Sequence, residues 1–317
     1  MESALKAGYR HIDCAPVYRN QTQVGAALTA ALASGLCTRD DLFITSKLMT
    51  YDLAPDGFEQ AVKQSLAELG VGYLDLLLLQ WPLPQLAPVA EQWAAMEALV
   101  DAGLVRDIGV SNFSAVKLAA LMDGGATGAQ DWVLGECRIK PSVNQVECGA
   151  HFRQEALLEA CKTRGVVMQA YGPLGSGDQF SADGLNRKRS GPPPLEHPAV
   201  IAAAADTGMT PAQVLIRWNI DRGVAVLPKS SNPTRQAENL AAAAAAAAAT
   251  ETTTFLPTLP SEHAAAVGAF SEQYRLQHGA FHTGPGKAYP TLADLWDEDC
   301  GYMEGREFEQ PAGFKLK

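Results

Sequence analysis

Short apolar runs alternate along this chain with longer stretches in which apolar residues recur every three or four positions. Such short runs are typical of buried strands, and the longer periodic stretches are typical of amphipathic helices. We therefore predict seven strands, at 9–14, 42–47, 75–80, 105–112, 142–148, 166–172 and 224–230. Strands that alternate with helices favour a parallel sheet, and nearly continuous apolar strands indicate burial on both faces.

The predicted helices carry recognisable end signals. Four periodic stretches are each followed by a glycine, at Gly35, Gly70, Gly103 and Gly165. Glycine readily adopts the left-handed conformation that closes a helix, so these positions predict helix C-termini. The stretch TPAQVLIRWNIDRG has Pro211 near its first turn, where the fixed φ of proline suits the start of a helix.

The repeated strand and helix order predicts a (β/α)8 TIM barrel, a fold that runs to roughly 250 residues or more as one unit. Only seven strands are predicted, and the opening ESALKAGYRHID indicates the end of a helix that leads into a strand. We therefore expect the first strand and most of the first helix to be missing. Because an unpaired sheet edge is a liability, we favour a truncated gene model or a fragment over a natural seven-stranded protein.

Domain organisation follows from the same pattern. We expect one barrel domain over residues 1–317, with the barrel core at 1–240. A low-complexity Ala/Thr segment covers 241–254, and an external helix and a C-terminal loop are expected over 255–317.

Composition narrows the classes of function. The chain is 47% hydrophobic and 19% charged, which is typical of a soluble globular protein. A net charge of −10 argues against nucleic-acid or membrane partners, although one phosphorylated small molecule remains allowed. Six scattered cysteines without a CxxC pair predict neither a disulfide framework nor a metal site. We expect a cytoplasmic monomer with reduced thiols.

Polar residues gather at the predicted carboxyl ends of the strands, which form the active site in such barrels. These residues are Asp13, Lys47, Gln80, Ser111, Asn112, Gln145, Tyr171 and Lys229. Tyr18 lies five positions after Asp13 and could act as a general acid. A phenol is a weak acid at neutral pH unless a nearby ammonium favours its phenolate, so Lys47, oriented by Asp13, is expected to lower the pKa of Tyr18.

Each of these residues also has a purely structural interpretation. Asp13 alone could cap a helix, and Tyr171 or Trp81 could be core aromatics. Lys229 and Arg235 could be the solvated start of a helix. Because Asp13, Tyr18 and Lys47 occur together, a catalytic role is favoured over these structural alternatives.

Several longer stretches resemble the aldo-keto reductase superfamily. They are GYRHIDCAPVYRN, LFITSKL, YLDLLLLQWP, GLVRDIGVSNFS, KPSVNQVECG, QAYGPLGSG, TPAQVLIRW and VLPKSSNPTRQAENL. The resemblance implies a TIM barrel that binds NADPH without a Rossmann fold and reduces aldehydes and ketones. It also implies catalytic roles for Asp13, Tyr18 and Lys47. Gln80 departs from the family pattern, which has a histidine before Trp-Pro.

The resemblance also implies a set of ligand-binding residues. Ser111, Asn112 and Gln145 would contact the nicotinamide carboxamide, and Tyr171 would stack on the ring. The segment 172–177, with Leu174 and Ser176, would lie near the pyrophosphate. Lys229, Ser230 and Arg235 would hold the 2′-phosphate, which an Arg fork suits, and Glu238 and Asn239 would contact the adenine. Trp81 would line the substrate pocket.

Two classes of function remain open. The first is an NADPH-dependent reductase of small carbonyl substrates, including sugar-like ones, in which Tyr18 gives the proton. The second is a catalytically impaired NADPH-binding sensor or regulatory protein, which Gln80 and the absent first strand make credible. A glutamine amide can donate a hydrogen bond to a carbonyl oxygen but cannot titrate near neutral pH. We therefore expect carbonyl reduction to survive with altered activity.

Overall fold

The computed structural model describes residues 1–50, 53–123, 137–176, 192–243, 256–271 and 273–297. All seven predicted strands are confirmed, and they form one sheet in chain order with parallel register wherever pairs are assigned. The strands are β1 (His11–Asp13), β2 (Phe43–Leu48), β3 (Leu74–Leu79), β4 (Val105–Ser111), β5 (Val143–Glu147), β6 (Val167–Tyr171) and β7 (Ala225–Leu227).

Helices follow most of the strands, as the periodic pattern predicts. They are α1 (Glu2–Ala7), α2 (Gln21–Ala33), α3 (Phe58–Leu69), α4 (Val89–Asp101), α5 (Ala115–Asp123), α6 (Glu155–Arg164), α7 (Pro198–Thr207), α8 (Pro211–Asp221), α9 (Pro233–Ala243), α10 (Ser261–Gly268) and α11 (Leu292–Trp296). The four glycines predicted to close helices all have positive φ, between 67° and 71°. Pro211 is the first residue of α8, and Thr210 closes a capping box with Gln213.

The strand and helix order is that of a (β/α)8 barrel, with seven strands among the described residues. Packing divides the chain into two compact units. The first unit is Met1–Val146, Ala156–Met168 and Ser231–Ala237, and the second is Glu147–Glu155, Gln169–Ser230 and Glu238–Lys317. A single domain over 1–317 stays a prediction. Most of the Ala/Thr segment at 241–254 lies outside the described residues.

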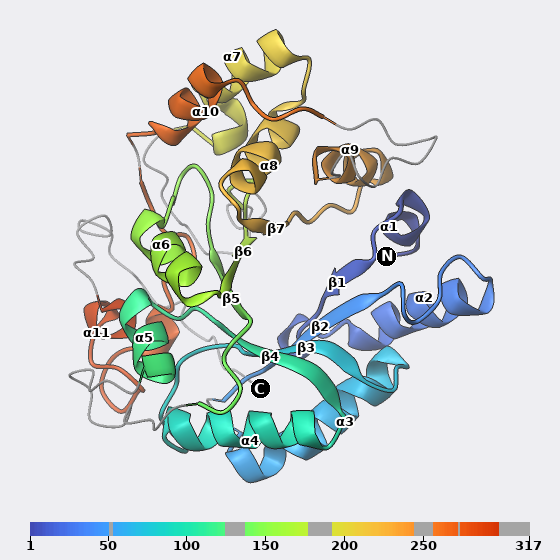
Figure 1. Ribbon diagram of the computed structural model, residues 1–317, viewed down its shortest axis with the longest axis vertical. Helices are drawn as coiled ribbons and strands as arrows, with labels where there is room; N and C mark the ends of the chain where they lie inside the picture. Colours follow the sequence, from blue (N-terminus) through green and yellow to red (C-terminus); the bar gives the residue numbers. More distant parts are fainter. Residues whose placement is uncertain (51–52, 124–136, 177–191, 244–255, 272, 298–317) are drawn as a thin grey trace. The chain divides into compact units, whose positions relative to one another are not determined.

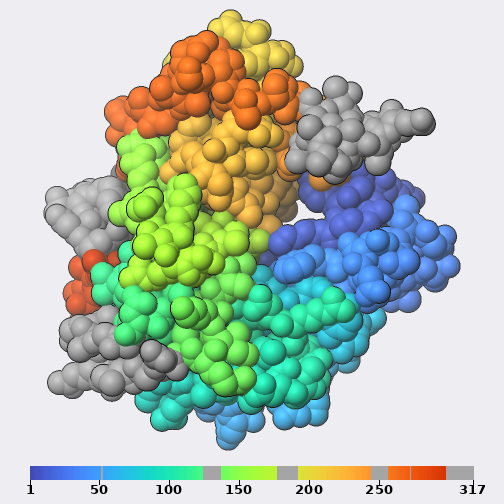
Figure 2. Space-filling view, in the orientation of Figure 1, coloured from blue at the N-terminus to red at the C-terminus, as the bar shows by residue number. Residues whose placement is uncertain are grey.

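In the first unit, helices α2, α3 and α4 cover the outer side of strands β1 to β4 (Figure 1). Strand β3 is buried at all six of its positions, as expected for a strand with helices on one face and a barrel interior on the other. A polar network fixes α2 against β2 and α3: Ser46 donates to Gln21 Oε1 over 2.8 Å, and Gln21 Nε2 donates to Glu68 Oε2 over 2.9 Å. The same helices form a continuous surface in the space-filling view (Figure 2).

Close packing of α2 on α3 depends on Gly25. A Cβ atom placed at this residue would overlap the Glu68 carbonyl oxygen and come within 2.9 Å of the Leu69 backbone. We predict that Gly25→Ala lowers the free energy of unfolding by about 1–3 kcal/mol, because the two helices would have to separate. Urea denaturation measures this effect. Gly72→Ala is the control, since a Cβ atom at that residue would meet nothing within 4 Å, and an equal loss in both variants would contradict the prediction.

The second unit has its own apolar core, built by α7, α8 and α10. Trp218 packs there with residues such as Val214 and Val267, and its indole nitrogen donates to the Ala264 carbonyl oxygen over 3.1 Å. Because that nitrogen has an acceptor, the large side chain can be only 4% exposed without an unpaired polar atom.

A buried carboxylate fastens the C-terminal segment, residues 273–297, within the second unit. Glu147 accepts the backbone N–H groups of Leu276 and Gln277, at 2.9 and 2.7 Å, and its side chain also contacts His151 Nε2 at 3.2 Å. Burial alone would raise the pKa of Glu147, but His151 and the two backbone donors outweigh it and hold that pKa below its usual value. The carboxylate therefore stays ionised.

Candidate active site

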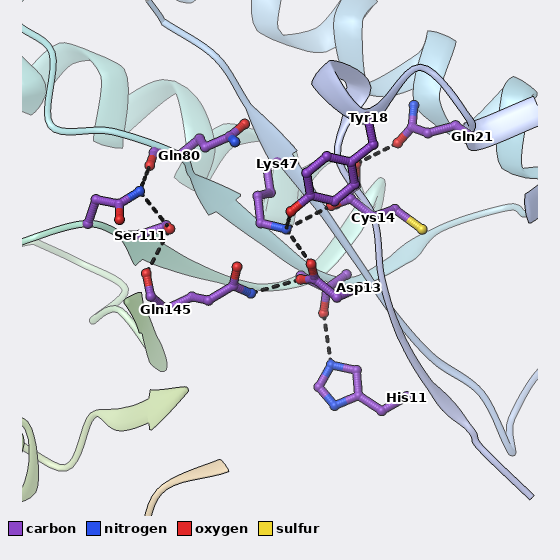
Figure 3. Close-up of polar contacts among 12 residues, drawn as sticks. His11, Asp13, Cys14, Tyr18, Gln21, Lys47, Gln80, Ser111 and Gln145 are labelled. Atoms are coloured by element: carbon purple, nitrogen blue, oxygen red, sulfur yellow. Dashed lines mark hydrogen bonds and ion pairs between the residues drawn. The ribbon is translucent and has the colours of Figure 1, made fainter. Parts of the chain in front are cut away.

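Asp13, Tyr18 and Lys47 lie together in the first unit (Figure 3). Asp13 ends β1, and Tyr18 follows it in a 3₁₀ turn, Pro16–Tyr18. Lys47 is in the neighbouring strand β2, whose parallel register pairs Asp13 with Thr45, two residues before Lys47. The carboxyl ends of adjacent parallel strands meet at one edge of a sheet, so the three side chains converge as the sequence predicts.

Lys47 is at the centre of this group and only 2% exposed. Its Nζ donates to Asp13 Oδ2 over 2.6 Å, to the Cys14 carbonyl oxygen over 3.0 Å and to the Tyr18 hydroxyl over 3.3 Å. Burial alone would lower the pKa of Lys47, but Asp13 and Tyr18 outweigh it and raise that pKa. All three ammonium donors have acceptors, so Lys47 is a fixed positive charge beside the phenol.

Tyr18 is accessible, with 48% of its surface exposed. Burial around its hydroxyl raises the pKa of Tyr18, while the Lys47 charge lowers it and Asp13 raises it, and the net shift is upward. About half of the Tyr18 surface is thus open, and its hydroxyl contacts the buried Lys47. The pKa reflects the surroundings of that hydroxyl. Lys47 therefore shifts the pKa of Tyr18 in the expected direction, and it is burial of the hydroxyl that keeps the phenol from being more acidic overall. A raised pKa keeps Tyr18 protonated, and protonated phenol is the form that can give a proton.

Gln80 follows β3 and its side chain reaches toward Lys47 and Tyr18 (Figure 3). Its backbone is fixed on both sides: its N–H donates to the Leu48 carbonyl oxygen over 3.0 Å, and Asn112 Nδ2 donates to its carbonyl oxygen over 2.9 Å. The backbone of Asn112 itself has a φ of 62°, a left-handed conformation that asparagine tolerates. The Oε1 atom of Gln80 is buried without a hydrogen-bond partner in the described structure.

Gln145 has a contact that sequence reasoning missed. Its Nε2 donates to Asp13 Oδ1 over 2.8 Å, across 132 positions of the chain. Ser111 Oγ and the Asn112 N–H both donate to the Gln145 carbonyl oxygen, at 2.7 and 3.0 Å. The position at a strand end marked Gln145 as a site residue, but nothing in the sequence pattern indicates which of the site's groups it contacts.

The remaining predicted cofactor residues are placed as follows. In the second unit, Tyr171 ends β6, the turn after it holds Leu174 and Ser176, Lys229 and Ser230 follow β7, and Glu238 and Asn239 lie in α9. Arg235 belongs to the first unit and is exposed in the first turn of α9. Gly172, Gly175 and Ser176 have φ of 62°, 84° and 44°, so the turn's backbone N–H groups are arranged irregularly rather than as a helix. Nucleotide contacts by these residues stay predictions.

Trp81 follows Gln80 and is 5% exposed, so its role in lining a substrate pocket also stays a prediction. Among the described residues, no group of three or more His, Cys, Asp and Glu side chains is arranged to hold a metal ion. No single described helix has the length and apolar character to cross a membrane. Helices α7 and α8 reach that length and apolar character only when taken together, and the chain bends by 94° between them. Cytoplasmic location and the monomeric state stay predictions.

Comparison with known proteins agrees with this geometry. The sequence profile of the Aldo/keto reductase family matches residues 1–254. An aldo/keto reductase of Synechocystis is 38% identical over 94% of this chain and 88% of its own length. Aldo-keto reductase family 1 member A1 of Mus musculus is 39% identical over 76% of this chain and 74% of its own. The crystal structure of a Bombyx mori aldo-keto reductase in complex with NADP matches with a TM-score of 0.71 and 33% identity, over 86% of this chain and 82% of that one.

Proposed function

Because this chain belongs to the aldo-keto reductase family, we propose that it reduces small aldehydes and ketones, including sugar-like carbonyls, to alcohols with NADPH. The observation that carries the proposal is the contact of a buried Lys47 with both Asp13 and the hydroxyl of Tyr18, a residue whose surface is about half exposed. A decayed site would be expected to lose these three residues independently.

Tyr18 acts as the general acid. When bound, NADPH supplies the hydride that adds to the carbonyl carbon. Tyr18 gives its proton to the carbonyl oxygen, which becomes the alcohol hydroxyl, and a phenolate is left on the protein. Lys47, held charged by Asp13, lies 3.3 Å from that phenolate oxygen and stabilises the new negative charge. Proton donation and charge stabilisation are thus divided between two neighbouring side chains.

Each unit, taken by itself, holds residues whose chemistry suits a part of the cofactor. Asn112 and Gln145 each carry an amide that can match a carboxamide group, and both lie beside Ser111. The turn at 172–176 has several positive-φ residues, which can turn backbone N–H groups toward a pyrophosphate. Arg235, exposed in the first unit, carries a guanidinium that suits the 2′-phosphate that distinguishes NADPH from NADH. Lys229, exposed in the second unit, carries a cation that also suits a phosphate. These features support NADPH as the cofactor.

The test is a turnover assay with purified protein. NADPH oxidation should proceed with members of a panel of short aldehydes, hydroxyaldehydes and ketones, and alcohol should form in equal amount. NADH should be used less efficiently. Binding of NADPH without turnover of any panel member would instead favour a sensor or regulatory protein.

Gln80 is proposed to donate an amide hydrogen bond to the substrate carbonyl without taking part in proton transfer. We predict that Gln80→His raises kcat by about tenfold and adds an ionisation near pH ~6.5 to the rate profile, because an imidazole can polarise the carbonyl and also titrate. Gln80→Leu should lower kcat, since it removes the donor. Unchanged kcat and pH dependence in Gln80→His would exclude this role for position 80.

A further inference from the structure

Asp13 is held at both oxygens of its carboxylate. Oδ2 receives Lys47 Nζ at 2.6 Å, and Oδ1 receives Gln145 Nε2 at 2.8 Å. The two donors come from different strands, β2 and β5, and reach Asp13 from different directions (Figure 3). A carboxylate with a donor on each oxygen cannot rotate without breaking one of the bonds. Its orientation toward Lys47 is therefore fixed by Gln145 as well as by the ion pair.

Gln145 is well suited to hold a neighbour in place. It is 1% exposed, and β4 pairs with β5 at Ser111 and Gln145. The Ser111 hydroxyl and the Asn112 N–H both donate to its backbone carbonyl oxygen. Because the backbone at position 145 is tied to β4, the amide can act as a rigid donor.

We propose that Gln145 is a positioning residue for the proton-donor group, which orients Asp13 so that Lys47 stays directed at the Tyr18 hydroxyl. This role rests on the proposed function and adds to the nicotinamide contact that the family resemblance implies for Gln145. It links strand β5 to the phenol through an ordered series of contacts: Gln145 to Asp13, Asp13 to Lys47, and Lys47 to Tyr18.

The first variant removes the donor and keeps the length of the side chain. Gln145→Met should lower kcat by about ten- to a hundredfold at saturating NADPH, because Asp13 loses the partner of Oδ1 and Lys47 is no longer held at the hydroxyl. If the only effect is weaker NADPH binding and kcat is unchanged, Gln145 acts on the cofactor alone and the proposal is wrong.

The second variant makes the contact depend on pH. In Gln145→Glu, the new carboxyl faces Asp13, and two carboxyl groups at this distance must share a proton. When the new carboxyl is protonated it can replace the amide donor, whereas its ionised form repels Asp13. The activity of this variant relative to the natural protein should therefore rise as pH falls from about 8 to about 5. A constant ratio would overturn the proposal.

The control tests whether the pH-dependent rise comes from the contact with Asp13 or from a contact with the cofactor. In the Asp13→Asn background, Gln145→Glu should produce no such rise, because no carboxylate faces it. A rise that persists there would assign the effect to the nicotinamide and contradict the proposal. Because Asp13→Asn is itself expected to lower activity, the same comparison is made on the cofactor-free protein by infrared spectroscopy.

The infrared measurement needs no turnover. Gln145→Glu should show a protonated carboxyl band at neutral pH that is lost when Asp13→Asn is added. Absence of the band in the single variant would show that residue 145 does not contact Asp13, and would contradict the proposal. If the natural protein reduces no carbonyl but the band behaves as expected, the Gln145–Asp13 contact holds and the proposed function fails, so the two failures are distinguishable.

Discussion

Tyr18→Phe is expected to lower kcat for carbonyl reduction by about 10² to 10⁴-fold, the usual contribution of a positioned general acid. The variant keeps the ring and removes only the hydroxyl that Lys47 contacts. NADPH affinity should change little, because the loss falls on proton transfer. Steady-state kinetics at saturating cofactor, with cofactor titration by fluorescence, measure both quantities.

The matched control makes the same chemical change elsewhere in the first unit. Tyr73 lies just before β3, between the guanidinium groups of Arg39 and Arg106, and takes no part in the site. Tyr73→Phe should leave kcat within about twofold of the natural value. Equal activity of Tyr18→Phe and the natural protein would remove Tyr18 as the proton donor.

The pH dependence of reduction follows from the direction of the Tyr18 shift. Its pKa lies above the ordinary phenol value near ~10. The proton to be given is therefore present throughout the neutral range, and the rate should decline on account of Tyr18 only above about pH 10. A decline centred near neutrality in the natural protein, with Gln80 in place, would show that a different group gives the proton.

Glu147→Gln is expected to cause the largest loss of stability. The carboxylate accepts two backbone N–H groups and contacts His151 in a fully buried position. An amide has one acceptor oxygen in place of two and turns an N–H₂ toward existing donors, so we expect about 2–4 kcal/mol of lost unfolding free energy. Urea denaturation measures this loss, and limited proteolysis should release fragments cut within 273–297.

The stability difference should itself depend on pH. The folded pKa of Glu147 lies below its usual value, so its stabilising contribution is complete above the unfolded pKa, about 4.5, and is lost as pH falls through the folded pKa. The gap between the natural protein and Glu147→Gln should therefore close in acid. Glu155→Gln, at an exposed position on the same unit, is the control and should cost less than about 1 kcal/mol. A gap that is constant down to strongly acidic pH would contradict this account.

Local pattern was sufficient for the secondary structure. Each strand corresponds to a short apolar run, and helix ends follow from residues such as Gly70 and Pro211, whose backbone preferences act within a few positions. The site residues could also be placed in part, because a parallel sheet brings the carboxyl ends of its strands to one edge. Asp13 and Lys47 were found in this way, and Tyr18 was found from its place five positions after Asp13.

The sequence by itself therefore determined the order of elements, the family and the set of polar residues at the strand ends, because these depend on period and local backbone chemistry. Tertiary structure alone decided which groups meet. Gln145 reaches Asp13 across 132 positions and Leu276 reaches Glu147 across 129, and no local pattern encodes such pairs. It also decided that the pKa of Tyr18 rises rather than falls, because that direction is the balance between burial and nearby charges, and burial exists only in the folded chain.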